Sequence, residues 1–287
     1  MAPRPRGFIE HWAPRPETRA LLDKVERVLA EYVDQLPLTL RQIFYRLVGT
    51  YHYEKTERAY ERLCETLAKA RRARIIPMHV IRDDGFASAA PFVFDDLEDF
   101  LSSVAASARD LRLDRQRGQG RRLALWCEAS GMVPQLERVA DPFGIGVYSS
   151  GGFDSLTDKH RIGRDWAEPI TVLHLGDHDP SGVHCFFALD EDVVAFAEHY
   201  GGDIEFIRLA VTEAQAQQYE LPSAPPKETD RRRFDGNETW QLEALDPRTL
   251  GEIVRAAIEA RFDRVVFDKV LTAEKEVRRA VLSRLGL

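Results

Sequence analysis

Two carboxylates two positions apart follow directly on an apolar stretch of the sequence. Asp177 and Asp179 come after the run 170–175 and are bracketed by Gly176 and Gly182. On extended backbone, side chains at i and i+2 point to the same side, so both carboxylates can face one cavity. The glycines allow tight turns beside them. Oxygen ligands of this kind suit Mg²⁺, which takes one or two carboxylates together with water and phosphate oxygens.

A third carboxylate has a matching position earlier in the chain. Glu128 directly follows the short apolar run 123–127. An Asp-x-Asp pair alone is common in solvated loops and at helix starts, so the longer string carries the argument: apolar strand, Gly-Asp-x-Asp-Pro-x-Gly, then helix. Such a site would polarise a phosphate and stabilise the leaving oxygen. Glu128 would either complete the metal site or act as a general base or acid.

The second half of the sequence alternates between strand-like and helix-like segments. Apolar runs occur at 123–127, 145–148, 170–175 and 204–209, and helical stretches at 132–140, 155–165 and 183–199. This alternation predicts an α/β fold of the Rossmann-like kind, with a mainly parallel sheet covered by helices on both faces. Functional groups of such sheets gather at the carboxyl ends of the strands, where all three carboxylates are expected. From residue 247 onward the sequence is helical, with apolar stripes that suit a core or a dimer surface.

The first half predicts a smaller helical domain. Residues 1–16 read as a flexible arm, and helices are expected at 17–35, 40–48 and 54–74, with Thr39 as the second helix's N-cap and Gly49 at its end. A β-like run at 77–85 follows. This order is typical of a winged-helix DNA-binding domain, whose third helix enters the major groove. A plain helical bundle for protein contacts is the alternative.

The remaining domain boundaries follow from composition. A further helix is expected at 91–108, so the winged-helix-like domain spans 17–108. Residues 109–122 are rich in arginine and predict an exposed basic linker, and 123–287 form the catalytic domain with its C-terminal helices.

Charge points to local rather than general binding of nucleic acid. The net charge is −7, which argues against a coat protein that covers nucleic acid throughout. Arginines nevertheless cluster near residues 71–74, 109–122 and 231–233, and arginine suits phosphate because its planar fork binds two oxygens. Solvated charged faces are the alternative for each cluster. The candidate DNA contacts are Arg41, Arg71, Arg72, Arg74, Lys227 and Arg231.

Cysteine spacing and hydropathy predict the compartment. The three cysteines, Cys64, Cys127 and Cys185, lie far apart and form no Cys-x-x-Cys pair, which indicates a reduced setting without a zinc site. No apolar run approaches the ~18 residues that a membrane helix needs, and the start of the sequence lacks the apolar core of a secretory signal. We therefore expect a cytoplasmic protein that makes no membrane contact.

Several segments resemble a known family. Residues 126–131 (Trp-Cys-Glu-Ala-Ser-Gly) and 174–182 (His-Leu-Gly-Asp-His-Asp-Pro-Ser-Gly) resemble the two signature motifs of Toprim domains. The Asp-Pro-x-Gly form looks most like the A subunit of topoisomerase VI and its meiotic double-strand-break relative. Residues 40–45 resemble that family's winged-helix segment ending in the DNA-attacking tyrosine, and 241–245 its late Glu-x-x-Ala-Leu element. The chain is also similar to the Toprim subunit of the Wadjet plasmid-defence system.

The resemblance implies roles for particular residues. Glu128, Asp177 and Asp179 would act as metal ligands or acid/base groups, with Mg²⁺ as the cofactor and Mn²⁺ as a substitute. Tyr45 would be a covalent nucleophile, with Arg41 one turn earlier beside the phosphate. The sequence departs from the family pattern at two positions, because a glutamine (position 42) stands where an acid is common and a phenylalanine (position 44) replaces one tyrosine of a pair. Tyr45 has a plain alternative role as a core residue.

Three functional classes follow from these features. The first is a hydrolytic, Mg²⁺-dependent endonuclease, and the second is a topoisomerase-like transesterase that uses Tyr45. The second would need an ATPase partner subunit, because the sequence has no Walker motif. The third is a non-catalytic DNA-binding module. A homodimer with one active site for each strand is the simplest route to a double-strand cut.

Overall fold

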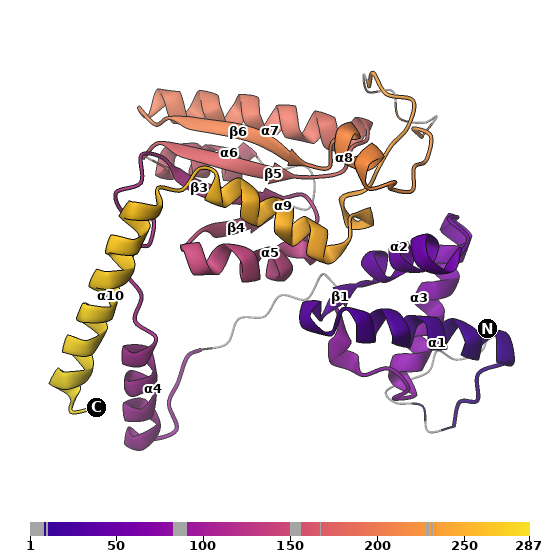
Figure 1. Cartoon of the computed structure of the whole chain (residues 1–287), viewed down its shortest axis with the longest axis horizontal. Coiled ribbons are helices and arrows are strands. Elements are labelled where there is room, and N and C mark those ends of the chain that lie inside the picture. The colour runs from indigo at the N-terminus through magenta and orange to yellow at the C-terminus, as the bar shows by residue number, and fades with distance from the viewer. Residues whose placement is uncertain are drawn as a thin grey trace.

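The chain is a mixed α/β protein whose main sheet has four strands, all parallel (Figure 1). The computed structural model describes residues 9, 11–82, 91–149, 156–166, 168–227, 230, 232 and 234–287. The sheet is ordered β4-β3-β5-β6. Its strands are β3 (Arg122–Cys127), β4 (Gly146–Ser149), β5 (Ile170–Leu175) and β6 (Ile204–Ala210). The prediction of an α/β fold with a parallel sheet is confirmed.

Helices make up most of the remaining regular structure. Their bounds in the described chain are α1 (Pro16–Glu31), α2 (Leu40–Tyr51), α3 (Glu57–Arg72), α4 (Leu97–Arg109), α5 (Val133–Ala140), α6 (Leu156–Asp165), α7 (Pro180–His199), α8 (Glu213–Gln218), α9 (Pro247–Glu259) and α10 (Arg264–Leu285). Two two-residue strands, β1 (Leu38–Thr39) and β2 (Ile81–Arg82), pair in parallel beside the first three helices. No helix within the described residues is both long and apolar enough to span a bilayer.

The two faces of the sheet bury different helices because the side chains of each strand alternate. Leu123 and Leu125 of β3 pack in a cluster with residues of α5 and α9. Ala124 and Trp126 point the other way, into a cluster with residues of α6 and α7. β3 and β5 are central strands, and all six residues of β5 are buried. This burial explains why their sequences read as continuous apolar runs.

The N-terminal helices follow the predicted pattern closely. Thr39 caps α2 with a reciprocal capping box, in which its hydroxyl accepts the Gln42 N–H and the Gln42 side chain accepts the Thr39 N–H. α3 is capped by Thr56 and buries one apolar face. The prediction that Gly49 ends the second helix is wrong, because α2 continues through Gly49 and ends before His52, which adopts a left-handed backbone conformation.

The β-like run predicted at 77–85 is mostly not a strand. Residues 78–80 form a 3₁₀ turn, and only Ile81 and Arg82 are extended, opposite β1. The remaining positions of that run, including the Asp-Gly turn, lie outside the described residues. The apolar residues of the run serve instead to close the core of the three helices, in which Ile81 is buried.

The helix predicted at 91–108 forms as α4, but it does not belong with the three N-terminal helices. α4 packs beside α10, and Figure 1 shows the two helices side by side, extending away from the sheet. The predicted domain boundary after residue 108 therefore needs correction, because the chain passes from one unit to the other before α4. The N-terminal apolar core consists of residues from α1 to β2, together with Ala244 from the C-terminal half.

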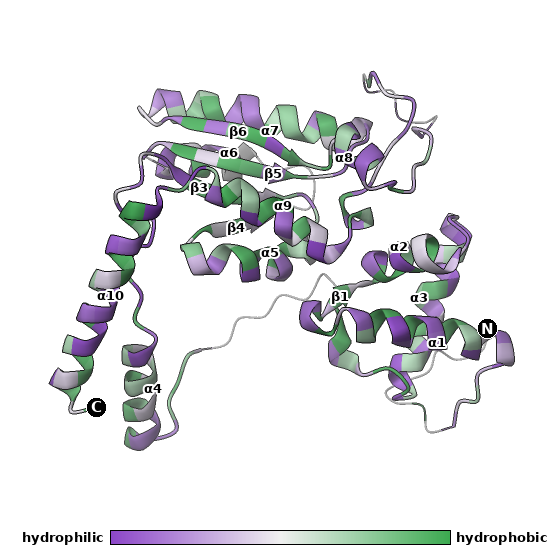
Figure 2. Cartoon of the chain, viewed as in Figure 1, coloured by the Kyte–Doolittle hydropathy of each residue, from purple (hydrophilic) through white to green (hydrophobic). Residues whose placement is uncertain are grey.

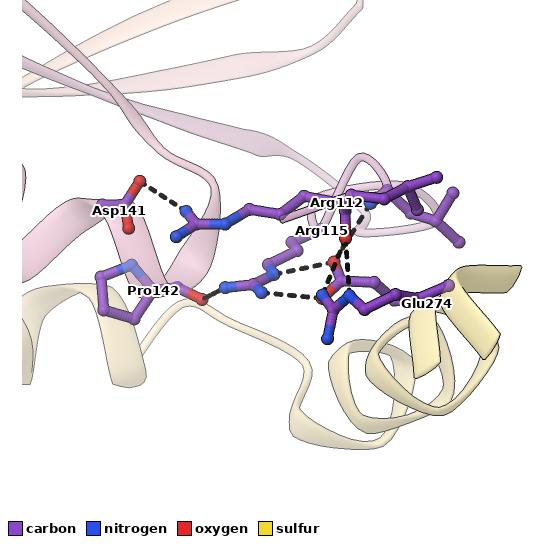
Figure 3. A network of polar contacts seen from close by, with 8 residues as sticks. Arg112, Arg115, Asp141, Pro142 and Glu274 are labelled. Carbon is purple, nitrogen blue, oxygen red and sulfur yellow. Dashed lines mark hydrogen bonds and ion pairs between the residues drawn. The ribbon is translucent and has the colours of Figure 1, made fainter. Parts of the chain in front are cut away.

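Four arginines of the predicted basic linker at 109–122 form ion pairs: Arg112, Arg115, Arg121 and Arg122. Arg112 pairs with Asp141 at 2.6 Å and Arg122 with Asp114 at 2.7 Å. Arg115 reaches Glu274 of α10, whose side chain is 3% exposed (Figure 3). The segment keeps exposed residues, Arg109 and Arg117 among them, but Arg112 and Arg115 pair with residues outside it and so attach it to the rest of the chain.

Glu274 is the centre of this anchoring network (Figure 3). Its carboxylate accepts hydrogen bonds from the Leu113 N–H at 3.1 Å and from Arg115 Nη2 and Arg278 Nη2 at 2.8 Å each. The hydrogen bonds to Arg115 hold the pKa of Glu274 below its usual range. Arg278 also donates to the Leu111 carbonyl at 2.7 Å. The network therefore fixes α10 to the segment that joins α4 to β3.

We expect Glu274→Ala to lower the free energy of unfolding by about 3 kcal/mol, because it leaves two arginines without their shared buried partner. Urea unfolding of both proteins measures the difference. Asp268→Ala is the matched control, since Asp268 forms an exposed pair with Arg264 and should contribute less than about 1 kcal/mol. Equal effects of the two substitutions would show that the network does not anchor α10.

Candidate functional site

The carboxylates lie where the order of the strands reverses. From β3 the chain passes through α5 to β4 on one side, then through α6 to β5 on the other side of β3. Cys127 at the end of β3 pairs with Leu175 at the end of β5, and the Glu128 N–H donates to the Leu175 carbonyl at 2.9 Å. Parallel α/β sheets bind ligands at such a switch point, beside the carboxyl ends of the strands. Glu128 and Asp177 follow the two strands that flank it.

Each of the three carboxylates uses one oxygen in a backbone contact. Asp179 is the N-cap of α7 and accepts the Gly182 N–H at 2.7 Å. Asp177 accepts the Leu242 N–H at 2.8 Å, and Glu128 lies 3.4 Å from the Asp177 N–H. These contacts fix the three side chains while leaving each of them a second carboxylate oxygen.

Two glycines make room for this arrangement. A Cβ atom on Gly182 would lie 2.3 Å from the Asp177 carbonyl oxygen and 3.0 Å from Glu128 Oε2. A Cβ atom on Gly176 would lie 2.9 Å from the same Glu128 oxygen. The contact with the Asp177 backbone is closer than any real Cβ atom tolerates, so position 182 requires glycine, whereas a side chain at position 176 would have to displace the side chains of His174 and Glu128.

The carboxylates disturb one another's ionisation. Burial, followed by the charge of Asp177, raises the pKa of Glu128 to about 7. Burial also raises the pKa of Asp177, with the charge of Asp179 adding to the effect. Like charges held together in a partly buried site favour the protonated forms or a bound cation. Perturbed acids of this kind gather at functional sites, although structural clusters also produce them.

The site fits Mg²⁺ through the chemistry of its oxygen donors and not through a complete set of protein ligands. Within the described residues, no group of three or more His, Cys, Asp or Glu side chains is arranged to hold a metal ion. Mg²⁺ needs fewer protein ligands, because it is bound through one or two carboxylates and completes its shell with water and phosphate oxygens. The unused oxygens of Asp177, Asp179 and Glu128 are carboxylate donors of the kind that Mg²⁺ binds. A bound cation would also neutralise their negative charges, which repel one another.

Sequence reasoning did not identify Arg208 as part of the site. Its guanidinium group donates hydrogen bonds to the carbonyls of Gly176, Asp177 and Gly182. These hydrogen bonds hold the two ends of the acidic loop together. Burial lowers the pKa of Arg208, and the negative charges of Glu128, Asp177 and Asp179 raise it in opposition. The signal in the sequence is a single arginine inside the otherwise apolar end of β6.

The N-terminal helices reach the same site through Gln241. Its side-chain oxygen accepts hydrogen bonds from Tyr45 at 2.5 Å and from Arg41 Nη1 at 2.8 Å. The next residue, Leu242, donates its N–H to Asp177. Arg41 also lowers the pKa of Asp177 against the effect of burial. The structure therefore links Tyr45 and Arg41, through Gln241 and Leu242, to the loop that holds Asp177.

Tyr45 itself is enclosed. Its side chain is 6% exposed and packs within the N-terminal core, with its ring 5.4 Å from that of Phe44. Burial raises its pKa above the ordinary value for tyrosine, with a further contribution from the charge of Asp177. A phenol in this state remains protonated at neutral pH and is held by Gln241.

Buried polar contacts fasten α2 to the C-terminal half beside the site. Thr39 Oγ1 donates to Glu243 at 2.6 Å, and Gln42 Nε2 donates to Gln135 of α5 at 2.6 Å. Glu243 lies 3.8 Å from Arg41. The motif residue Glu243 is therefore explained by the contact between the two halves. The departure at Gln42 is explained in the same way, because its amide both caps α2 and bridges to Gln135 of the C-terminal half.

The other predicted DNA contacts lie in separate places. Arg71 and Arg72 end α3, and Arg74 follows in a left-handed turn with a φ of 61°. Lys227 is in the irregular segment after α8, and Arg231 lies outside the described residues. Arg41 is the candidate that the structure joins to the carboxylates. Its side chain is 49% exposed, so it remains available to a phosphate.

His174 and His178, two histidines near the site, pack against neighbouring aromatic side chains. His178 forms a backbone bridge with Trp240, and its ring packs on Trp240 and Phe234. His174 is buried on β5, and this burial lowers its pKa to about 3. Comparison with protein-family models and with curated proteins gives no match to this chain.

Proposed function

We propose that this protein is a Mg²⁺-dependent enzyme that cleaves DNA phosphodiester bonds at a Toprim-like site formed by Glu128, Asp177 and Asp179. The observation that carries the proposal is the meeting of these carboxylates at the switch point of the parallel sheet, where burial and neighbouring negative charge raise the pKa values of Glu128 and Asp177. Such a concentration of negative charge is unfavourable without a cation, and it suits a reaction at a phosphate.

The chain's own residues have distinct parts in this proposal. Asp177 and Asp179 would hold the ion, either Mg²⁺ or Mn²⁺, which when bound would supply Lewis-acid stabilisation of charge on the phosphate. Glu128, with a pKa of about 7, accepts a proton from the attacking water or returns one to the leaving oxygen. Arg41, one side of which is open to solvent, binds a DNA phosphate beside them.

Hydrolysis is the reaction that the surroundings of Tyr45 favour. A nucleophile must reach the phosphorus atom, but the Tyr45 side chain is 6% exposed and its hydroxyl is bound to Gln241. Its raised pKa also keeps the hydroxyl in the weakly nucleophilic neutral form. We therefore assign Tyr45 to positioning Gln241, and through it Leu242 and Asp177.

The second candidate function is a tyrosine transesterase that works with an ATPase partner. A specific observation favours it, since Tyr45 and Asp177 are close enough for their charges to act on each other. In that case DNA binding would rotate Tyr45 out of the N-terminal core. In both proposals the helices α1 to α3 form the DNA-binding part, with Arg71, Arg72, Arg74 and Lys227 as further phosphate contacts. A non-catalytic DNA-binding module is the outcome if no cleavage occurs.

The test is cleavage of supercoiled plasmid by the purified full chain with Mg²⁺ or Mn²⁺, comparing wild type with Tyr45→Phe. We expect nicked and linear products from both proteins, with rates within about tenfold of each other, because Phe keeps the packing and only releases Gln241. After denaturation without protease, the DNA ends should carry no protein.

Loss of cleavage in Tyr45→Phe, with protein attached to the DNA ends made by wild type, would establish the transesterase instead. If wild type binds plasmid but cuts it with neither ion, the hydrolytic proposal is wrong. Tyr53→Phe is the matched control, because Tyr53 donates to the Ala59 carbonyl away from the carboxylates.

A further inference from the structure

The segment that leads into α4 exposes an unusual number of large apolar side chains. Phe92 is 83% exposed, Val93 and Leu97 are each 72% exposed, and Leu101 is 55% exposed. Phe94 completes an ordered aromatic group, with its ring 4.9 Å from that of Phe92. A contiguous apolar patch of this kind on a folded protein usually marks an interaction surface.

α4 and α10 together form an arm that the rest of the chain leaves uncovered. Of the residues of α4, only Ala108 is buried, and in the 22 residues of α10 only Phe267 and Glu274 are buried. The two helices lie beside each other and extend away from the sheet (Figure 1). Hydrophobic residues recur along both, between hydrophilic ones (Figure 2). Helices depend on burial of an apolar face for most of their stability.

The apolar residues of α4 have the spacing of a helix-bundle seam. Leu97, Leu101, Val104 and Ala108 follow one another at intervals of four, three and four residues. This is the spacing by which side chains on one helix fit between those of another. Ala108 is buried at the root of the arm, whereas Leu97 and Leu101 at its outer end are exposed. The seam therefore continues beyond what α10 of the same chain covers.

Charges on the arm are arranged for a second arm of the same kind. The start of α4 is acidic, with Asp95, Asp96, Glu98 and Asp99. The later part of α10 is net basic, with Lys275, Arg279 and Arg284 against the single acid Glu276. Across the described residues, no ion pair joins these two groups. α4 and α10 run in opposite directions along the arm, so the acidic and basic groups lie towards the same, outer end (Figure 1).

We propose that the arm is a homodimer interface, in which the α4–α10 pairs of two chains form a four-helix bundle about a two-fold axis along the arms. In this arrangement each α4 lies between its own α10 and the α10 of the partner. The acidic start of one α4 then faces the basic part of the other α10, and the reverse contact follows by symmetry. Leu97 and Leu101 fill the centre of the bundle, as in other bundles of this type.

This interface has a consequence for the proposed cleavage. Glu274 fixes α10 to the segment before β3, so a dimer of arms holds two carboxylate sites in one assembly. That consequence rests on the proposed function, whereas the dimer rests on the arm alone. The state of association can therefore be measured whether or not the protein cuts DNA.

The first test is sedimentation of the full chain over a range of concentrations, comparing wild type with the double variant Leu97→Asp/Leu101→Asp. Wild type should be a dimer at micromolar concentrations. The variant should raise the dimer Kd at least about a hundredfold, because each dimer loses four buried leucines. Val33→Asp, at an apolar position 68% exposed on the N-terminal half, should leave the dimer unchanged.

Charge reversal gives a second test that does not depend on the apolar positions. Lys275→Glu/Arg279→Glu and Asp95→Lys/Glu98→Lys should each weaken the dimer, and the four substitutions combined should restore it to within about tenfold of wild type. A wild type that stays monomeric at tens of micromolar overturns the proposal. A dimer that ignores both the leucine and the charge variants would show that another face is used, and would equally overturn it.

Discussion

Asp177→Asn should lower the rate of divalent-ion-dependent plasmid cleavage by about 10²- to 10³-fold, the loss typical of removing one electrostatic contact to a developing charge. Asparagine keeps an oxygen that accepts the Leu242 N–H, so the loop after β5 should retain its position. The variant removes the negative charge and the ion ligand while preserving the hydrogen bond. Rates measured by gel quantification under single-turnover conditions give the comparison.

DNA affinity provides the control for this experiment. Because Arg41 and the helices α1 to α3 are unchanged, Asp177→Asn should bind plasmid within a few-fold of wild type in the absence of cleavage. Asp203→Asn is the matched substitution, since Asp203 pairs with Arg121 at the opposite end of the sheet and should cut normally. Cleavage by Asp177→Asn at the wild-type rate would remove Asp177 from the active site.

Glu128→Gln should make the metal-free protein more stable at pH 8. The pKa of Glu128 is about 7 in the folded chain and 4.5 for an ordinary glutamate side chain, so folding favours its protonated form. Its stabilising contribution is therefore complete below pH 4.5 and is lost as pH rises through 7. Glutamine keeps an acceptor for the Asp177 N–H but never acquires the charge. After allowance for solvent screening, we expect a gain of about 1–2 kcal/mol at pH 8.

Urea unfolding in EDTA at pH 8 and at pH 4 measures this effect. The difference between the two proteins should be largest at pH 8 and should nearly vanish at pH 4. Addition of Mg²⁺ should stabilise wild type more than the variant, because binding to the folded state alone adds to stability. A Glu128→Gln protein that is less stable than wild type at pH 8 would contradict the interpretation that the fold destabilises the ionised form of Glu128.

The sheet was predictable from the sequence because its physical causes are local. β3 and β5 are buried on both faces, so they appear as unbroken apolar runs, and the carboxylates follow them directly. The rule that parallel strands end at a common edge then brought Glu128 to Asp177. The caps of α2 and α3, Thr39 and Thr56, are equally local, and the first of them was predicted.

The errors and omissions have a different origin, because they depend on long-range contacts. Within 109–122, the ion pairs of Arg112 and Arg115 could not be predicted, because only the fold brings Asp141 and Glu274 beside them. Gly49 resembles a helix end, but α2 continues because residues beyond it still pack on the N-terminal core. Arg208 lies in the site only because β6 pairs with β5, and the spacing of residues in the sequence does not predict which strands pair.

Gln241 shows how one residue can have a role that only the fold reveals. Its side chain binds Tyr45 and Arg41 of α2, and the next residue along the chain orients Asp177. Almost 200 positions separate Gln241 from its two partners in α2. Local sequence gives no reason for a glutamine there. The contact makes the N-terminal helices part of the site, so under the proposed function DNA bound to them would lie beside the carboxylates.

The most direct measurement of the central claim is ion binding to the carboxylates, independent of any DNA substrate. Metal-free protein titrated with Mn²⁺ and followed by electron paramagnetic resonance should show a bound ion that Mg²⁺ displaces. The same titration of Glu128→Gln/Asp177→Asn should lose that site, while Asp203→Asn retains it. Absence of bound Mn²⁺ at millimolar concentrations, or binding that the double variant leaves unchanged, would contradict the account.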